Sequence, residues 1–290
     1  MGRTVAAAYR SEVCIVREEQ VQVYGWGEAR PQWSQRVKGS VTAVACTPQV
    51  VYVATTSSLI RLPRRPFEPA QRYALPTRTG APTRLWAYNA QVGLLTERGG
   101  LWHARYPEMR WQLLELSKAA LTSVALWESQ AVLADSEGQV YHLELGTIRV
   151  LARWSGGLGG VYDWAWHPRG KWIAGACADG LVKLWTPATG KPLQAFAAHR
   201  LPPRLIAAHP NGNQLVSLGM DGLLFFYDLV QGRAQLDAPL HAPDDATDAL
   251  ALHWESEKRL WLLTASGFHA CTLPEGRWRT QPIPYKRPNQ

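Results

Sequence analysis

Short apolar stretches, each ended by a turn, run along most of the chain. The clearest lie between residues 160 and 199, where three turn sequences separate four stretches, at residues 161–166, 171–177, 181–185 and 193–196. Asp179-Gly180 forms the tightest of these turns, because glycine accepts the positive φ that a tight hairpin requires. Runs of this length with this punctuation predict β-strands joined as hairpins.

A second copy of the pattern follows at once. His209-Pro210-Asn211-Gly212 matches His167-Pro168-Arg169-Gly170, and Asp221-Gly222 matches Asp179-Gly180. Tyr227-Asp228 occupies the place of Trp185-Thr186. The copies are 42 residues apart, from position 167 to position 209. Three landmarks repeated at one interval indicate an internal structural repeat.

These landmarks resemble the WD-repeat family, in which units of roughly 40 to 45 residues each form one four-stranded propeller blade. The resemblance is clearest over residues 160–232 and implies an all-β propeller. It also implies a structural hydrogen-bonded set of a turn Asp, a His before the first strand, a Ser or Thr in the second strand and a Trp in the third. In these two blades Gly219 and Cys177 stand where the hydroxyl is expected, and the blade motif comprises Asp179, Trp185, His199, Asp221, Tyr227 and Asp228.

Comparable units can be traced along the rest of the 290 residues. First strands are expected near positions 5, 41, 83, 122, 161, 204 and 249, which predicts seven blades, with six or eight as alternatives. The expected blades of a single domain, residues 1–290, span residues 4–37, 41–76, 82–116, 121–154, 160–199, 203–238 and 247–284. Radial repetition explains why the 14 tryptophans are spread along the chain. The sequence leaves two ways to close the ring. Either every blade is built from consecutive strands, or an N-terminal strand completes the last blade.

Composition agrees with a large packed core, since 46% of residues are hydrophobic and 19% are charged. No stretch reaches the roughly 18 uncharged apolar residues of a membrane helix, and the N-terminus lacks the apolar region of a secretory signal. None of the four cysteines forms a Cys-x-x-Cys pair, which favours buried thiols over disulfides or a zinc site: Cys14, Cys46, Cys177 and Cys271. We therefore expect a cytoplasmic protein.

Patterns typical of catalysis are not found: the chain has no Gly-x-Ser-x-Gly, phosphate-binding loop or His-Glu-x-x-His. The glycine-rich residues 156–160 precede a strand, so they predict a loop between blades. His167, His209 and His253 recur near one position of three blades. Such positions lie on the order of 10 Å apart, the spacing of packed sheets, so we expect histidines that cap turns. The sequence predicts no enzyme, no metal and no cofactor.

The net charge of +8 suits an acidic or polyanionic partner. A proline-rich segment with one acid, Glu68, contains the candidate partner-binding residues, expected to project from loops of the second blade: Arg61, Arg64, Arg65, Arg72, Arg78 and Arg84. Arginine binds carboxylates and phosphates through two parallel hydrogen bonds, although a simply solvated loop is the alternative. A later segment has the opposite sign, with Asp237, Asp244, Asp245 and Asp248.

Function is implied by the resemblance, because WD-repeat proteins mostly act by protein docking. We expect a non-catalytic scaffold that binds one or more proteins, including partners with an acidic surface, within a multi-protein assembly. The alternative is binding of nucleic acid or another polyanion through the arginine-rich segment, which salt would weaken steeply. An enzyme at the mouth of the central channel is disfavoured, because the first strands supply mostly Ala, Trp and Thr there.

Overall fold

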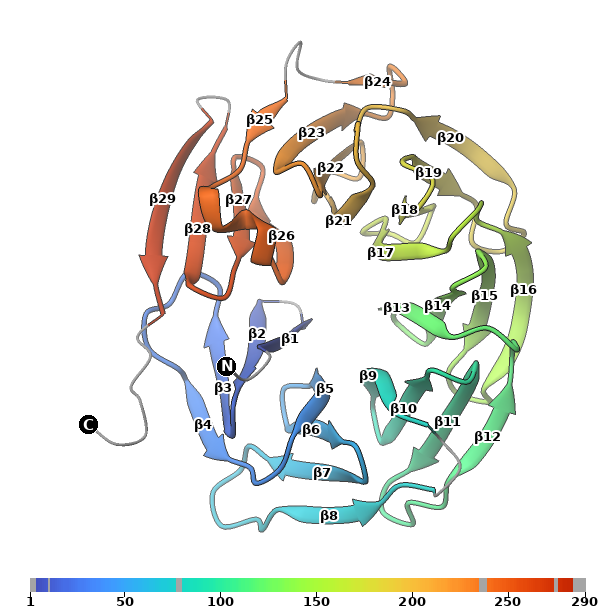
Figure 1. Cartoon of the computed structure of the whole chain (residues 1–290), viewed down its shortest axis with the longest axis vertical. Coiled ribbons are helices and arrows are strands. Elements are labelled where there is room, and N and C mark those ends of the chain that lie inside the picture. The colour runs from blue at the N-terminus through green and yellow to red at the C-terminus, as the bar shows by residue number, and fades with distance from the viewer. Residues whose placement is uncertain (1–3, 10, 77–79, 235–238, 274–275, 284–290) are drawn as a thin grey trace.

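Seven antiparallel sheets stand radially around one axis in a computed structural model of the chain (Figure 1). The structure describes residues 4–9, 11–76, 80–234, 239–273 and 276–283. Each sheet is one blade and is built from consecutive strands, with its first strand nearest the axis. The predicted all-β, seven-bladed propeller is confirmed.

The first four blades each contain four strands. Their bounds in chain order are β1 (Val5–Tyr9), β2 (Glu12–Arg17), β3 (Gln20–Gly25) and β4 (Trp33–Arg36); β5 (Val41–Cys46), β6 (Val50–Thr55), β7 (Ser58–Pro63) and β8 (Gln71–Ala74); β9 (Pro82–Tyr88), β10 (Gln91–Thr96), β11 (Gly100–Arg105) and β12 (Gln112–Glu115); β13 (Leu121–Trp127), β14 (Gln130–Asp135), β15 (Gln139–Glu144) and β16 (Arg149–Ser155).

The last three blades follow the same order, except that the outer strand of blade 6 is in two pieces. β24 pairs with the end of β23, and β25 pairs with its beginning. A short 3-10 helix, η1 (Asp244–Asp248), then leads into blade 7. The strands are β17 (Val161–Trp166), β18 (Ile173–Cys177), β19 (Val182–Trp185) and β20 (Pro192–Phe196); β21 (Pro203–Ala208), β22 (Gln214–Gly219), β23 (Leu223–Asp228), β24 (Arg233–Ala234) and β25 (Leu240–His241); β26 (Ala251–Ser256), β27 (Arg259–Leu263), β28 (Gly267–Thr272) and β29 (Arg277–Pro282).

Burial follows from this radial stacking. The middle strands are covered on both faces by neighbouring blades, so β6 and β10 are buried along their whole length. The outer strands have one free face, and β4 and β8 alternate between half-buried and exposed residues. One apolar cluster fills each of the seven interfaces between neighbouring blades. The core is therefore a ring of seven apolar clusters, one between each pair of neighbouring blades.

Within the described residues, blade 7 packs on blade 1 and each of the two blades is built from its own consecutive strands, which answers the question that the sequence left open. Aromatic rings fill this seam: Phe268 of β28 lies edge-on to Tyr24, Trp26 and Trp261, with ring centroids 5.9 to 6.2 Å apart. Such contacts add to simple area burial, so aromatic packing closes the ring in place of strand pairing.

The two Asp-Gly turns form as predicted. Gly180 and Gly222 have φ values of 89° and 75°, a region that glycine enters without strain. In each turn the aspartate accepts the backbone N–H two residues later, from Leu181 and Leu223 respectively. These turns place two carboxylates on the same face of blades 5 and 6.

Candidate interaction faces

The arginine-rich segment does not form one surface. Arg61 lies in β7 and is buried; its guanidinium binds Glu68 at 2.6 Å and covers the ring of Tyr106 at 4.2 Å from the centroid. Arg64 holds Glu12 of blade 1 through two hydrogen bonds of 2.6 and 2.9 Å. The expectation that these two side chains project into solvent was wrong, because each forms an ion pair with a carboxylate of the same chain.

The remaining candidate arginines are dispersed. Arg65 is exposed in the loop after β7. Arg72 lies on β8, where it donates to Ser58 Oγ (2.7 Å) and to the carbonyl of Lys38 (3.0 Å). Arg84 is on β9, beside the axis, and donates to the carbonyl of Thr83. Arg78 lies outside the described residues.

Charge separates instead between the two faces of the ring. We call acidic face the one formed by the turns between second and third strands and the loops between blades. Its described loops hold nine acids, Glu18, Glu19, Glu97, Glu137, Asp179, Asp221, Asp244, Asp245 and Asp248, against four bases, Lys38, Arg98, Lys118 and Arg200. Asp237 of the predicted acidic segment lies outside the described residues.

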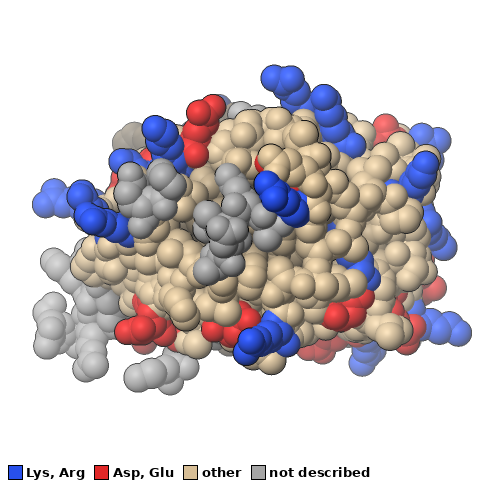
Figure 2. Space-filling view, turned by 90° about the horizontal axis from the view of Figure 1, so that it is seen from above, with Lys and Arg blue, Asp and Glu red and all other residues tan. Residues whose placement is uncertain are grey.

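The opposite face, which we call the basic face, is formed by the turns between first and second strands and the loops between third and fourth. Its described loops hold eight bases, Arg30, Arg64, Arg65, Arg110, Arg169, Lys171, Lys191 and Lys258, against five acids, Glu28, Glu68, Glu108, Glu128 and Glu257. In the edge-on view of Figure 2, Lys and Arg predominate along one edge and Asp and Glu along the other.

Exposed apolar side chains gather on the acidic face over blades 5 and 6. Leu158 is 82% exposed and Leu201 49%, both in loops that lead into first strands. Tyr162 at the start of β17 and Met220 in the turn after β22 are 41% and 45% exposed. We call these four residues the blade 5–6 patch. Among the described residues of the basic face, the exposed large apolar side chains are Phe67 and Val230, which lie singly in blades 2 and 6.

A recurrent bulge explains why Tyr162 reaches solvent. In blades 2 to 6 the second residue of the strand nearest the axis is left unpaired. In blades 2, 3 and 4 this residue is Thr42, Thr83 or Thr122, whose hydroxyl donates to a second-strand carbonyl. Blade 5 has the exposed Tyr162 at this position, whereas Arg204 of blade 6 donates to the carbonyls of Ala246 and Thr247.

Beside Tyr162, Asp163 connects the two blades. Its Oδ2 accepts the backbone N–H of Ile206 in β21 at 3.0 Å. Burial raises the pKa of this carboxyl to about 6, although the backbone donors of Ile206 and Trp164 and the charge of Arg84 oppose the shift. The first strands of blades 5 and 6 are thus held together directly beneath the blade 5–6 patch.

The three recurrent histidines are structural. His167 and His209 cap their turns as predicted, since each Nδ1 accepts the backbone N–H two residues later, at 2.8 and 3.1 Å. His253 differs: its ring stacks on Trp26 at 4.7 Å, and burial lowers its pKa to about 4. Within the described ranges, no three His, Cys, Asp or Glu side chains are placed to hold a metal.

The blade motif contains a residue that the sequence reasoning missed. In blade 6, His199 Nε2 bonds Ser217 Oγ at 2.6 Å, and Ser217 Oγ bonds the Tyr227 hydroxyl at 2.8 Å. Asp221 Oδ1 lies 3.7 Å from His199 Nδ1. The hydroxyl position is therefore Ser217, four residues before the turn aspartate, and the assignment of Gly219 was wrong. Asp228 instead caps the next loop by accepting the N–H groups of Val230 and Gln231.

Blade 5 fills the same place with different chemistry. Gly175 stands four residues before Asp179, so the hydroxyl is missing, and the assignment of Cys177 was wrong in the same way. The Lys183 ammonium binds Asp179 and also donates to the carbonyl of Gly156 at 3.0 Å. Trp185 packs against Trp154 and Trp164. An ion pair and indole packing thus replace the hydrogen-bonded set.

Comparison with known proteins agrees with this architecture. Residues 148–186 match the family model described as WD domain, G-beta repeat. The chain is a WD40-repeat β-propeller. Subunit 5 of the transcription initiation factor TFIID from Caenorhabditis elegans is 24% identical to it over 167 residues. That match covers 58% of this chain and 23% of the relative, so the chain spans about a quarter of that protein's length.

Solved structures share the fold of this WD40 propeller. KlHsv2 with its loop 6CD replaced by a Gly-Ser linker superposes with a TM-score of 0.77 and 11% identity, covering 97% of this chain and all of that one. The computationally designed Ika8 protein gives 0.72 and 18%, with 95% and 85% coverage. A chain of the mitotic checkpoint complex gives 0.69 and 14%, with 83% and 76% coverage.

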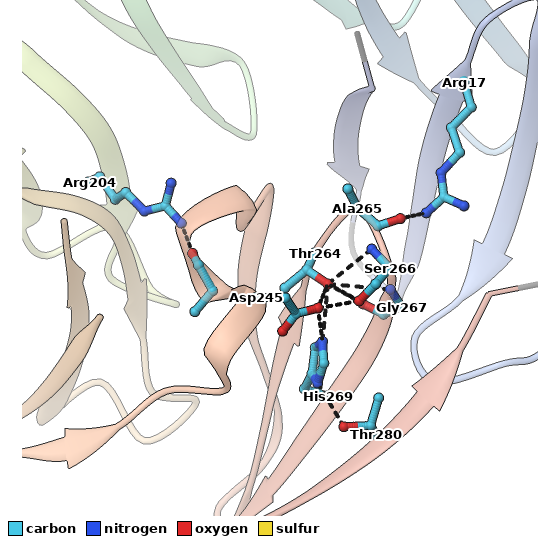
Figure 3. A network of polar contacts seen from close by, with 10 residues as sticks. Arg17, Arg204, Asp245, Thr264, Ala265, Ser266, Gly267, His269 and Thr280 are labelled. Atoms are coloured by element: carbon cyan, nitrogen blue, oxygen red, sulfur yellow. Dashed lines mark hydrogen bonds and ion pairs between the residues drawn. The ribbon is translucent and has the colours of Figure 1, made fainter. Parts of the chain in front are cut away.

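The WD40 propeller braces its acidic face where blades 6, 7 and 1 meet (Figure 3). Asp245 of η1 accepts hydrogen bonds from Thr264 (2.8 Å) and Ser266 and lies 3.1 Å from His269 Nε2. These hydroxyls and His269 hold the pKa of Asp245 below its usual value, although burial opposes them. Arg17 of blade 1 donates to the carbonyl of Ala265. The acidic face is therefore a connected framework, not a set of free loops.

Proposed function

We propose that this WD40 propeller is a non-catalytic scaffold that binds at least one protein through its acidic face, within a multi-protein assembly. The observation that carries the proposal is the blade 5–6 patch, where four large apolar side chains are exposed on adjacent blades. Soluble surfaces rarely gather such residues unless they mark an interaction site. Protein docking is also the usual work of WD40 propellers.

The surroundings of the described histidines and cysteines support the non-catalytic part. The described histidines with hydrogen-bond partners, such as His199, His209 and His269, are bound to hydroxyls, carboxylates or backbone groups that hold the blades. All four cysteines are free and buried, which agrees with placing the assembly in the cytoplasm. Burial raises the pKa of Cys46 and Cys177 to about 12, so neither is a thiolate nucleophile at neutral pH.

Affinity capture with the full chain from its own cells tests the scaffold. We expect a stoichiometric protein to be retained, and to be lost when Leu158→Asp and Met220→Asp are combined. The matched control combines Leu151→Asp with Leu193→Asp, which are 40% and 46% exposed on outer strands and should leave capture unchanged. Equal capture by both variants, or a lone monomer with nothing retained, would contradict the proposal.

Polyanion binding is a second candidate, favoured by the excess of basic residues on the basic face. The useful variant is Arg65→Glu with Arg169→Glu and Lys171→Glu, all exposed. Arg64 is unsuitable because its loss would also break the contact with Glu12. Binding to RNA or DNA that falls steeply with salt and is abolished in this variant would support the second candidate. A signal that the variant leaves unchanged would remove it.

A further inference from the structure

We infer that the blade 5–6 patch receives a protein segment that carries bulky apolar side chains flanked by lysine or arginine. This inference rests on the proposed scaffold function and deepens it by naming the chemistry of the partner. It comes from three features of the acidic face: how Leu158 is presented, how the four residues are tied together, and which charges surround them.

Leu158 is exposed in a loop whose backbone is fixed by hydrogen bonds. The glycine-rich residues 156–160 pack their backbone onto neighbouring turns: Gly156 N–H donates to the carbonyl of Gly138 at 2.7 Å, and Ala178 N–H donates to that of Gly160 at 3.0 Å. Side chains at Gly157 and Gly160 would collide with the turns of blades 5 and 4. Glycine is needed at these positions so that the loop backbone can pack closely against the two turns. Leu158 is therefore the one exposed apolar side chain of the loop. A preorganised apolar side chain loses little entropy on binding.

The other three residues are fixed by the same framework. Met220 N–H donates to the carbonyl of Pro202, the neighbour of Leu201, at 3.1 Å. Tyr162 sits on the bulge of β17, next to the Asp163 contact with β21. Because β17 and β21 lie side by side around the axis, the four residues lie on the same face of the ring and on adjacent blades. Tyr and Met are well suited to such contacts, since Tyr offers a large apolar ring with a polar hydroxyl and Met adapts its shape to a partner.

The surrounding charge selects the partner. Over blades 4 to 7 the described loops of the acidic face carry six acids, Glu137, Asp179, Asp221, Asp244, Asp245 and Asp248, against one base, Arg200. Arg204 at the start of β21 adds a second positive charge, which interacts with Asp248. Lys183, His199 and His269 already accompany Asp179, Asp221 and Asp245. Glu137, Asp244 and Asp248 are exposed and make no ion pair within 4 Å to any described residue. A basic segment complements these three carboxylates, whereas an acidic one is repelled.

Selection from a displayed library of short random peptides on the immobilised full chain tests the inference. Enriched peptides should combine Leu, Phe, Trp or Met with an excess of Lys or Arg over Asp and Glu. Their affinity should fall about tenfold or more with Leu158→Asp and several-fold with Asp244→Lys plus Asp248→Lys, and it should weaken with salt. The Leu151→Asp plus Leu193→Asp control should bind normally, and circular dichroism should show every variant folded.

Other results would overturn the inference. Enrichment of acidic peptides, binding that ignores Leu158, or no enrichment at all would each contradict the stated chemistry. A dimer of the chain that Leu158→Asp dissolves would show that a second copy occupies the patch. The capture experiment separates failure of this inference from failure of the proposed scaffold function. If only the chemistry of the partner is wrong, capture from cells will still depend on Leu158 and Met220.

Discussion

The arginine-rich segment and the acidic loops differ in how well a cluster of like charges in the sequence marks an exposed surface. In the arginine-rich segment, Arg61 of β7 binds Glu68 and Arg64 of the following basic-face loop binds Glu12, so both arginines stabilise the fold. On the acidic face Glu137, Asp244 and Asp248 remain exposed in loops of the same face that carries the blade 5–6 patch. The difference shows that a cluster of like charges in the sequence identifies a surface only after the partners within the chain are known.

Arg64→Ala has the largest expected effect and tests whether this basic-face arginine is structural. It leaves the Glu12 carboxylate without its partner at a mostly buried position, which we expect to lower the free energy of unfolding by about 3 kcal/mol. Arg65→Ala, one residue away and exposed, should change it by less than about 0.5 kcal/mol. Urea denaturation measures both. If both variants lose the same small amount of unfolding free energy, Arg64 is not a structural residue.

Ser217→Ala tests the framework under the acidic face. Removing this hydroxyl leaves His199 and the Tyr227 hydroxyl without their shared buried partner, at an expected loss of about 2 kcal/mol. The matched control on the basic face is Thr186→Ala, whose hydroxyl bonds the carbonyl of Lys191 in an exposed loop and should cost well under 1 kcal/mol. Thermal and urea melts that rank the two variants in the reverse order would show that the hydrogen-bonded set does not brace blade 6.

Asp163→Asn gives the smallest expected effect, through pH. Because burial raises the pKa of Asp163 to about 6, its stability contribution is complete below pH 4 and is lost as pH rises through 6. The unfolding free energy of the wild type should therefore fall, relative to the variant, by on the order of 1 kcal/mol across that window. Urea melts at several pH values measure the difference. A difference that stays flat between pH 4 and pH 7 would mean that this carboxyl titrates normally.

Much of the architecture could be predicted from local signals. Asp179-Gly180 and Asp221-Gly222 fixed two hairpins because only certain residues tolerate the required backbone. The structure's first strands begin at residues 5, 41, 82, 121, 161, 203 and 251, within two residues of the expected positions. Closure was not predictable, because the aromatic seam joins Tyr24 and Trp26 to Trp261 and Phe268, which are more than 230 residues apart in the sequence.

The candidate site was harder to predict because it depends on contacts between repeats. Arg64 could not be recognised as structural without knowing that Glu12 of another blade faces it. Ser217 was missed because the hydroxyl position was counted two residues too close to the turn. The sequence did contain a usable signal for the patch. Leu158 and Leu201 each lie just before a first strand, and the two leucines are 43 residues apart, which is nearly the repeat interval. Exposed leucines at equivalent loop positions indicate a shared surface.

Amide hydrogen exchange of the full chain, with and without the protein that it captures, is a direct test of the proposal that the acidic face binds the partner. We expect protection in residues 156–162 and 199–222, which carry the blade 5–6 patch, and unchanged exchange in the basic-face loops 64–70 and 186–191. Protection confined to those basic-face loops, with residues 156–162 unaffected, would contradict it.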